Sequence, residues 1–96
     1  MKITHTDIYL KWFSKLRDET AKATITRRLD MIKKSNHLGD YRFINENIYE
    51  IRIHCGAGYR LYFTMRGDEV ILLLCGGDKS SQNKDIELAK KIAKEV

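Results

Sequence analysis

The first third of the chain repeats apolar residues at the spacing of an α-helix. Ile8, Trp12 and Leu16 recur every four residues behind Thr6, and this spacing predicts a helix capped by the Thr6 hydroxyl. A second apolar stripe follows Asp18, another residue that caps helices well. Its members are Ala21, Ile25, Leu29 and Ile32. We therefore predict two consecutive helices that form a helical hairpin.

From residue 41 onward the period of the pattern changes from 3.6 to 2. Residues 48–55 and 59–66 alternate apolar and polar side chains, as half-buried β-strands do. Residues 70–75 form a continuous apolar run, which favours a strand covered on both faces. A short edge strand is predicted at residues 2–5. A last helix is predicted from a narrow stripe of Ile86, Ala89, Ile92, Ala93 and Val96. This order of elements is typical of an α+β fold with one sheet.

Residues 56–58, Gly-Ala-Gly, separate the two alternating strands. A three-residue loop keeps the apolar residues of both strands on one face, whereas a two-residue loop would mix the faces. The pattern therefore predicts a three-residue hairpin loop. The predicted cross-strand pairs are Cys55 with Tyr59, His54 with Arg60, and Arg52 with Tyr62.

Composition excludes several classes of protein. The 96 residues fit one small domain, residues 1–96, and they include no proline and carry a net charge of +5. No apolar stretch reaches the roughly 18 residues of a membrane span, and no N-terminal segment resembles a signal peptide. Cys55 and Cys75 are too few for a disulfide framework and lack the spacing of a zinc site. We expect a cytoplasmic protein with reduced thiols and no membrane contact.

The polar face of the predicted hairpin is the strongest candidate for chemistry. It carries Arg52, His54, Arg60 and Tyr62 on adjacent strands. Guanidinium groups grip phosphate, imidazole exchanges protons near neutral pH, and a tyrosine ring stacks on bases. Cleavage of RNA by its own 2′-hydroxyl needs this set of groups and no metal. The alternative is a solvated sheet face that carries charges without a function.

A second candidate is the segment of residues 76–82, Gly-Gly-Asp-Lys-Ser-Ser-Gln. Two glycines between a buried strand and a helix let backbone amides approach an anion, and Lys79 adds a positive charge. Ser80 and Gln82 are then candidate substrate-binding residues. The spacing differs from that of a P-loop, so nucleotide binding is not expected. The alternative is a glycine turn followed by a helix cap at Asp78 or Ser80.

Several segments of the chain are similar to a known family. They are LRD at residues 16–18, GD at 39–40, YEIRI at 49–53, GAGYRLYF at 56–63 and LLLCGGDKSSQ at 72–82. On these segments the chain resembles the addiction-module killer proteins, the HigB-like branch of the RelE/ParE toxin superfamily. The resemblance covers essentially the whole chain. It implies a RelE-like fold, with an N-terminal helical hairpin and a C-terminal helix around a small, mainly antiparallel sheet.

The resemblance also implies a function and partners. It implies the toxin of a type II toxin–antitoxin module, which cleaves mRNA in the ribosomal A site without a metal or another cofactor and so inhibits translation. Its expected partners are a helix-turn-helix antitoxin protein, the ribosome and mRNA, with DNA contacted only through the antitoxin. Two alternatives stay open: a ParE-like poison of gyrase, and a family member that binds an antitoxin without nuclease activity.

The resemblance assigns roles to four residues of this chain. Arg60 would hold the scissile phosphate, and Arg52 would stabilise the transition state or assist proton transfer. His54 is the candidate general base or acid, and Lys79 a second phosphate contact. Glu50 occupies a position that is basic in the best-known mRNA-cleaving relatives. Their C-terminal tyrosine or histidine has no counterpart here, because Asp85 and Ile86 stand in that region, so the acid–base pair stays unassigned.

Overall fold

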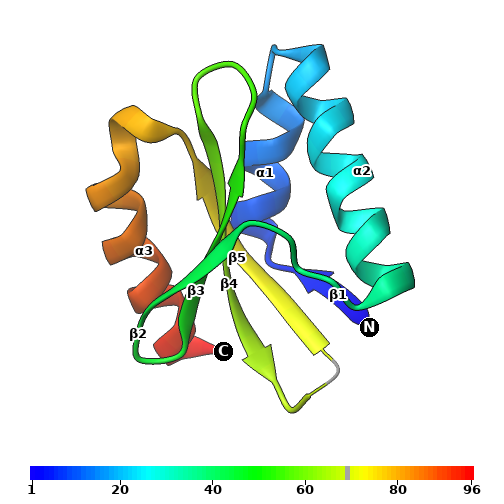
Figure 1. The fold of residues 1–96 in the computed structure, drawn as a ribbon. Coiled ribbons are helices and arrows are strands. Elements are labelled where there is room, and N and C mark those ends of the chain that lie inside the picture. Colours follow the sequence, from blue (N-terminus) through cyan, green and yellow to red (C-terminus); the bar gives the residue numbers. More distant parts are fainter. Residues whose placement is uncertain (69) are drawn as a thin grey trace.

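The computed structural model describes residues 1–68 and 70–96, in which five strands form one sheet of order β1-β5-β4-β3-β2 (Figure 1). The strands are β1 (Lys2–His5), β2 (Tyr41–Asn45), β3 (Ile48–Ile53), β4 (Tyr59–Arg66) and β5 (Val70–Gly77). β1 pairs in parallel with β5, and the other neighbours pair antiparallel. The predicted α+β fold with a mainly antiparallel sheet is confirmed.

Helices cover both faces of this sheet (Figure 1). They are α1 (Asp7–Lys15), α2 (Glu19–Ser35) and α3 (Gln82–Glu95), with a 3₁₀ turn, η1 (Lys79–Ser81), before α3. α1 and α2 lie on one face and α3 on the other. No helix in the described ranges is both long and apolar enough to cross a membrane.

The helix boundaries follow the predicted caps. The Thr6 hydroxyl accepts a hydrogen bond from the Tyr9 amide at 3.0 Å, and the Asp18 carboxylate accepts one from the Ala21 amide at 3.0 Å. Each bond satisfies an amide that has no partner inside its helix. α2 ends at Ser35, and Asn36 follows as its C-cap with a left-handed φ of 61° that stops the helix.

Alternating residues of the strands build two cores, one on each face. Ile51, Ile53, Leu61 and Phe63 are buried under α1 and α2. Tyr62, Leu72 and Leu74 are buried under α3, together with Ala89 and Ile92 of that helix. The apolar run of residues 70–75 therefore lies in a strand covered on both faces, as predicted.

The predicted register of the β3–β4 hairpin is wrong by two residues. The loop has five residues, 54–58, and the pairs are Ile53 with Tyr59 and Arg52 with Arg60. Gly56 and Gly58 take positive φ angles of 55° and 76°, which lets the loop curl without steric strain. A shift of two residues leaves every side chain on its predicted face, so the hydrophobic pattern alone does not separate the two registers.

Gly76 and Gly77 also differ from the prediction, because both belong to β5 and pair with Leu61 and Arg60 of β4. A Cβ atom on Gly76 would lie 2.4 Å from the Trp12 ring, and one on Gly77 would lie 1.7 Å from the Asp85 carboxylate. The two glycines therefore make room for the protein's own side chains. The structure therefore does not place an anion-binding loop at Gly76 and Gly77, because both lie within a paired strand.

The two cysteines are free thiols in different environments. Cys75 is buried under α3, and burial raises the pKa of its thiol to about 12. Cys55 is partly exposed in the hairpin loop. At about pH 8 we expect iodoacetamide to alkylate Cys55 and to spare Cys75, because only the thiolate reacts and Cys75 stays protonated. Mass spectrometry should find one adduct on the native chain and two after denaturation. Equal labelling of both thiols in the native protein would contradict this packing.

Candidate active site

The candidate residues of the hairpin lie on the face of the sheet that α3 partly covers. On this face the strand register aligns side chains of neighbouring strands in two rows. In the first row Arg42 of β2 pairs with Glu50 of β3, which pairs with Tyr62 of β4. In the next row Arg52 of β3 pairs with Arg60 of β4. Since paired residues on one face lie about 5 Å apart, the three arginines surround Glu50.

Glu50 is fully buried, with an exposed fraction of 0%. Its carboxylate accepts hydrogen bonds from Arg42 Nε at 2.9 Å and from Gln82 Nε2 of α3 at 3.0 Å. Arg52 Nε lies 3.7 Å and Arg60 Nε 3.6 Å from its oxygens, which is ion-pair distance. A buried carboxylate needs such partners, because burying an unpaired charge is costly. Glu50 therefore holds the arginines in place on the sheet.

Sequence reasoning missed Arg42 and misjudged the environment of Glu50. Arg42 follows Tyr41, where the alternating pattern begins, but residues 41–45 are too short and too exposed to identify as a strand from alternation alone. The alternation of residues 48–55 puts Glu50 on the polar face of the hairpin, beside Arg52. The structure buries it instead, because Gln82 at the start of α3 closes over the carboxylate.

Tyr62 is buried as well, with an exposed fraction of 0%. Its hydroxyl is enclosed beside Glu50, and burial, followed by the charge of Glu50, raises the pKa of the phenol. A ring in this position cannot stack on an RNA base, so the predicted stacking role of Tyr62 is wrong for this conformation. Its place is in the core beneath α3.

His54 is not opposite Arg60, because it lies in the hairpin loop beyond the end of β3. Its Nε2 contacts the Asp40 carboxylate, and its side chain is 72% exposed. The hydrogen bond from His54 is the largest influence on Asp40 and lowers the pKa of that carboxyl, with Arg52 and Arg28 adding to the effect. Asp40 is thus a functional candidate that the sequence reasoning did not identify. Its only advance signal was the Gly39-Asp40 pair within the family resemblance.

A pocket of about 550 Å³ brings the basic candidates together. It is lined by the loop of residues 54–58, including His54, and by Arg60 and Lys79. The Lys79 amide donates to the Ala57 carbonyl at 3.3 Å, which ties η1 to the hairpin loop. Gly58 lies next to Lys79, where a Cβ would be in ordinary contact at 3.4 Å, and its φ of 76° is the feature that favours glycine there. Three groups that can contact a phosphate therefore share one opening.

The remaining sequence candidates lie beside this pocket. The Ser80 hydroxyl and amide both donate to the Asp78 carboxylate, at 2.6 and 2.8 Å, so Asp78 is the cap of η1. Gln82 donates to Glu50. Lys79, Ser80 and Gln82 also line a second pocket of about 330 Å³ that continues to Lys84. Ser80 and Gln82 are thus hydrogen-bonded to Asp78 and Glu50, and both also line the second pocket next to Lys79.

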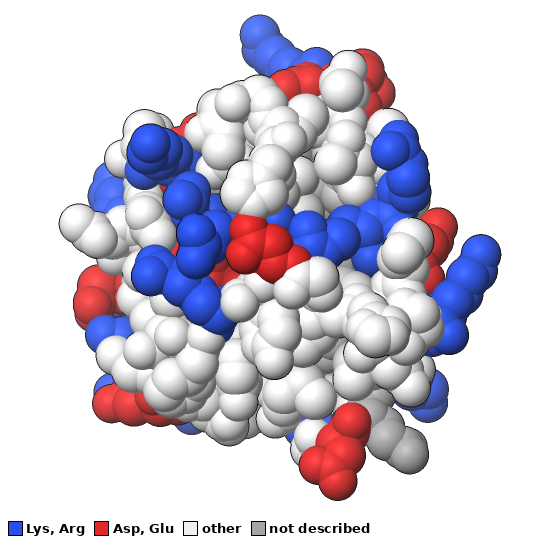
Figure 2. Space-filling view, in the orientation of Figure 1, with Lys and Arg blue, Asp and Glu red and all other residues white. Residues whose placement is uncertain are grey.

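The charge of the site is positive but partly balanced. Arg42, Arg52 and Arg60 lie at ion-pair distance from the carboxylates Glu50 and Asp40. With Lys79 of the pocket, four positive charges stand against two negative ones, a surplus of two. Figure 2 shows Lys and Arg atoms in a band across the face in front of the sheet, with acidic atoms within the band. Arg52 lies between both carboxylates, 3.9 Å from Asp40 and 3.7 Å from Glu50. The side chains best placed to contact an added phosphate are therefore Arg60 and Lys79.

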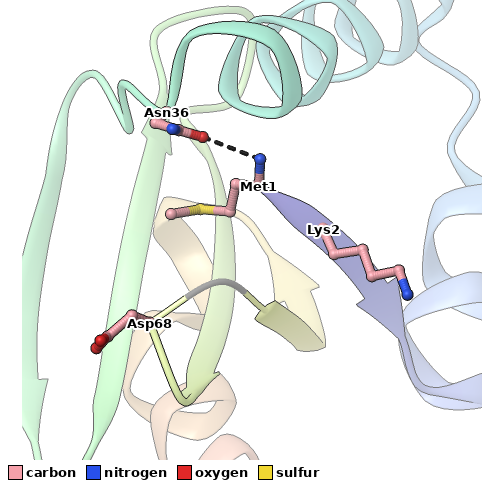
Figure 3. A pocket seen from close by; sticks show the side chains of 4 residues that line it. All are labelled: Met1, Lys2, Asn36 and Asp68. Atoms are coloured by element: carbon pink, nitrogen blue, oxygen red, sulfur yellow. Dashed lines mark hydrogen bonds between the residues drawn. The ribbon is translucent and has the colours of Figure 1, made fainter.

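Another pocket, of about 620 Å³, lies at the far end of β4 and β5 (Figure 3). Met1, Lys2, Asn36 and Asp68 line it. The N-terminal ammonium group donates to Asn36 Oδ1 at 2.9 Å and to the Lys33 carbonyl at 3.2 Å. These bonds fasten β1 to the end of α2. The pocket contains none of the candidate site residues.

Within residues 1–68 and 70–96, no group of three or more His, Cys, Asp or Glu side chains is arranged to hold a metal ion.

The fold belongs to a known structural class, that of the RelE toxins. A variant of E. coli RelE in the free state matches with a TM-score of 0.71 and 19% identity, over 95% of this chain and 96% of that one. RelE of the E. coli RelBE toxin–antitoxin complex matches with a TM-score of 0.65 and 19% identity, over 80% of this chain and 94% of that one. A chain of the RelB–RelE complex of Methanococcus jannaschii matches with a TM-score of 0.67 and 18% identity, over 85% of this chain and 96% of that one. At such identities the similarity establishes the fold.

The family follows from the sequence match. Residues 11–95 match the family described as phage derived protein Gp49-like (DUF891), and the chain belongs to that family. It is also 42% identical over 96 residues to an uncharacterized protein of Haemophilus influenzae. The aligned region covers 100% of this chain and 96% of that protein. The solved structures confirm the RelE-like fold that the resemblance implied, and the sequence match places the chain in the Gp49-like family.

Proposed function

We propose that this protein is the toxin of a toxin–antitoxin pair and that it inhibits translation by cleaving mRNA on the ribosome. The observation that carries the proposal is the pocket shared by His54, Arg60 and Lys79 on a RelE fold. The pocket combines two cations for a phosphate with one group that exchanges protons near neutral pH.

The proposed reaction uses the 2′-hydroxyl of the RNA as the nucleophile. As the bond from O2′ to phosphorus forms and the bond from phosphorus to O5′ breaks, negative charge increases on the phosphoryl oxygens. Arg60 and Lys79 stabilise this charge, an effect worth several kcal/mol when the donors are preorganised. His54 either accepts the 2′-hydroxyl proton or donates a proton to O5′, and water completes the second transfer. The products are a 2′,3′-cyclic phosphate and a 5′-hydroxyl.

The proposed partner is a small antitoxin protein that binds this chain and blocks the site. Support comes from two similar structures, which are complexes of RelE with the antitoxin RelB. For this chain we expect an antitoxin with a helix-turn-helix domain, so that DNA is contacted only through the antitoxin. The ribosome and mRNA are the proposed targets, in the cytoplasm.

A second candidate function is binding without RNA cleavage. It is favoured by Glu50, which neutralises part of the arginine cluster, and by the burial of Tyr62. Such a member would bind an antitoxin or a ribosome and leave mRNA intact. A gyrase poison, the other alternative, would need no chemistry on the sheet and would leave the pocket of His54, Arg60 and Lys79 without a role.

Mapping mRNA 5′ ends after induction separates these functions. We expect new 5′ ends within translated codons shortly after the chain is expressed, and none in untranslated RNA. Growth arrest with intact mRNA and an induced DNA-damage response would support action on gyrase instead. Intact mRNA with normal growth would support a member that only binds.

A further inference from the structure

The loop that leads into β2 brings a carboxylate to the imidazole of the candidate site. Asp40 contacts His54 Nε2 through one oxygen and lies 3.9 Å from Arg52 Nε through the other. His54 pairs with Asp40 and also lines the pocket of Arg60 and Lys79. Asp40 is not part of the pocket lining, and it touches the imidazole that is.

The position of Asp40 is fixed by Arg28 of α2. The Arg28 guanidinium donates to three backbone carbonyls: Leu38 at 2.8 and 3.1 Å, Asp40 at 2.9 Å and Arg52 at 2.9 Å. The Arg52 amide donates to the Asp40 carbonyl at 3.0 Å as well. Four hydrogen bonds from one side chain therefore join α2, the loop of residues 36–40 and β3.

Gly39 completes this arrangement. Its φ of 72° is left-handed, and a Cβ there would lie 2.7 Å from the Arg28 guanidinium. The small residue thus lets Arg28 reach the carbonyls on both sides of it. A loop held in this way presents the Asp40 side chain at one place, so the contact with His54 is built into the fold.

The chemistry of the pair follows from what each group can donate. The Asp40 carboxyl has a lowered pKa, so it is ionised at neutral pH and can only accept hydrogen bonds. His54 Nε2 must therefore carry the hydrogen of the contact, which leaves Nδ1 to exchange a proton with RNA. A carboxylate in this position fixes the tautomer and orientation of an imidazole and stabilises the imidazolium when it forms.

We propose that Asp40 is the positioning residue of His54 and that Arg28 and Gly39 hold Asp40 for this purpose. The inference rests on the proposed function, since it concerns the proton-transfer step of that reaction. As a base, Nδ1 takes the proton of the 2′-hydroxyl while the bond from O2′ to phosphorus forms. As an acid, it gives a proton to O5′ while the bond from phosphorus to O5′ breaks. Asp40 touches neither RNA nor phosphorus.

The test compares Asp40→Asn with the wild-type chain in mRNA cleavage on programmed ribosomes. Asparagine keeps the size of the side chain and removes its charge. We expect kcat to fall roughly 10- to 100-fold, which is part of what positioned proton transfer contributes. KM should stay within about threefold, because Arg60 and Lys79 still bind the phosphate. Asp30→Asn removes an exposed carboxylate of α2 and is the matched control, expected to retain wild-type kcat.

A double-mutant cycle distinguishes positioning from a structural effect. If Asp40 acts through His54, Asp40→Asn should cause no further loss in a His54→Gln background. Additive losses would contradict the proposal. A wild-type chain that does not cleave mRNA at all would overturn the proposed function and, with it, the catalytic role of the pair.

A spectroscopic measurement tests the contact without RNA. Nitrogen NMR of the resting protein at about pH 8 should find His54 as the single tautomer with hydrogen on Nε2. Asp40→Ala should give a mixture of tautomers. The same mixture in the wild-type chain would contradict the contact, whether or not RNA is cleaved.

Discussion

Replacing Arg60 by alanine is expected to slow mRNA cleavage by about 100- to 1,000-fold, the loss typical for one preorganised donor to a developing negative charge. Arg60 is only 15% exposed and lines the pocket with Lys79 and His54. Its Nη1 donates to the Gly58 carbonyl at 3.1 Å, which fixes the guanidinium against the hairpin loop. The rate should be measured with purified chain on programmed ribosomes, at saturating ribosome concentration.

Two controls separate this effect from loss of the fold or of ribosome binding. Arg66→Ala removes an exposed arginine from the far end of the same strand, β4, and should leave the rate unchanged. Binding of Arg60→Ala to ribosomes should weaken only a few-fold, because many cationic contacts share the electrostatic attraction. Cleavage within about threefold of the wild-type rate by a folded Arg60→Ala chain would remove Arg60 from the site.

Replacing Glu50 by alanine is expected to cost about 3 kcal/mol of folding free energy, near the lower end of the range for breaking a buried ion pair. The carboxylate is fully buried, and its loss leaves Arg60 without its counter-charge. Arg42 and Arg52 are partly exposed and regain contact with water, which limits the cost. For a chain of this length the melting temperature should fall by roughly 12–24 °C, measured by thermal denaturation.

Glu87→Ala is the matched control for Glu50→Ala. Glu87 is 74% exposed and pairs with Lys90 on the surface of α3, at 3.2 Å. Exposed pairs of this kind contribute about 0–1 kcal/mol, so the melting temperature should change by less than about 8 °C. A Glu50→Ala chain that melts together with the wild-type protein would contradict the central place of Glu50 in the site.

Local signals in the sequence were sufficient for much of the fold. Thr6 and Asp18 cap helices through their own side chains, so those boundaries depend on nearby residues only. The apolar run of residues 70–75 needs cover on both faces wherever it lies. The hairpin register was not predictable in this way. Loops of three and five residues give the same alternation, and the difference lies in the curled backbone at Gly56 and Gly58.

The site depends more strongly on contacts that are distant in sequence. Arg52, Arg60 and Lys79 could be placed near one another from the strands and from the family resemblance. Asp40 could not, because its position depends on Arg28, 12 residues away on α2. The burial of Glu50 depends on Gln82, 32 residues later, and alternation within one strand contains no information about that helix. In both cases the missing information was which segment packs over the strand.

The proposed reaction takes place at the pocket of His54, Arg60 and Lys79 and uses the 2′-hydroxyl of the RNA as the nucleophile. The most direct measurement uses the purified chain, programmed ribosomes and an mRNA with one 2′-deoxynucleotide at the mapped cleavage position. The buffer contains EDTA at a concentration that leaves the ribosomes intact. We predict cleavage of the all-ribose mRNA to a 2′,3′-cyclic phosphate and no cleavage of the deoxy-substituted mRNA. Equal cleavage of both mRNAs would rule out the 2′-hydroxyl as the nucleophile, and no cleavage of either would rule out a ribosome-dependent nuclease.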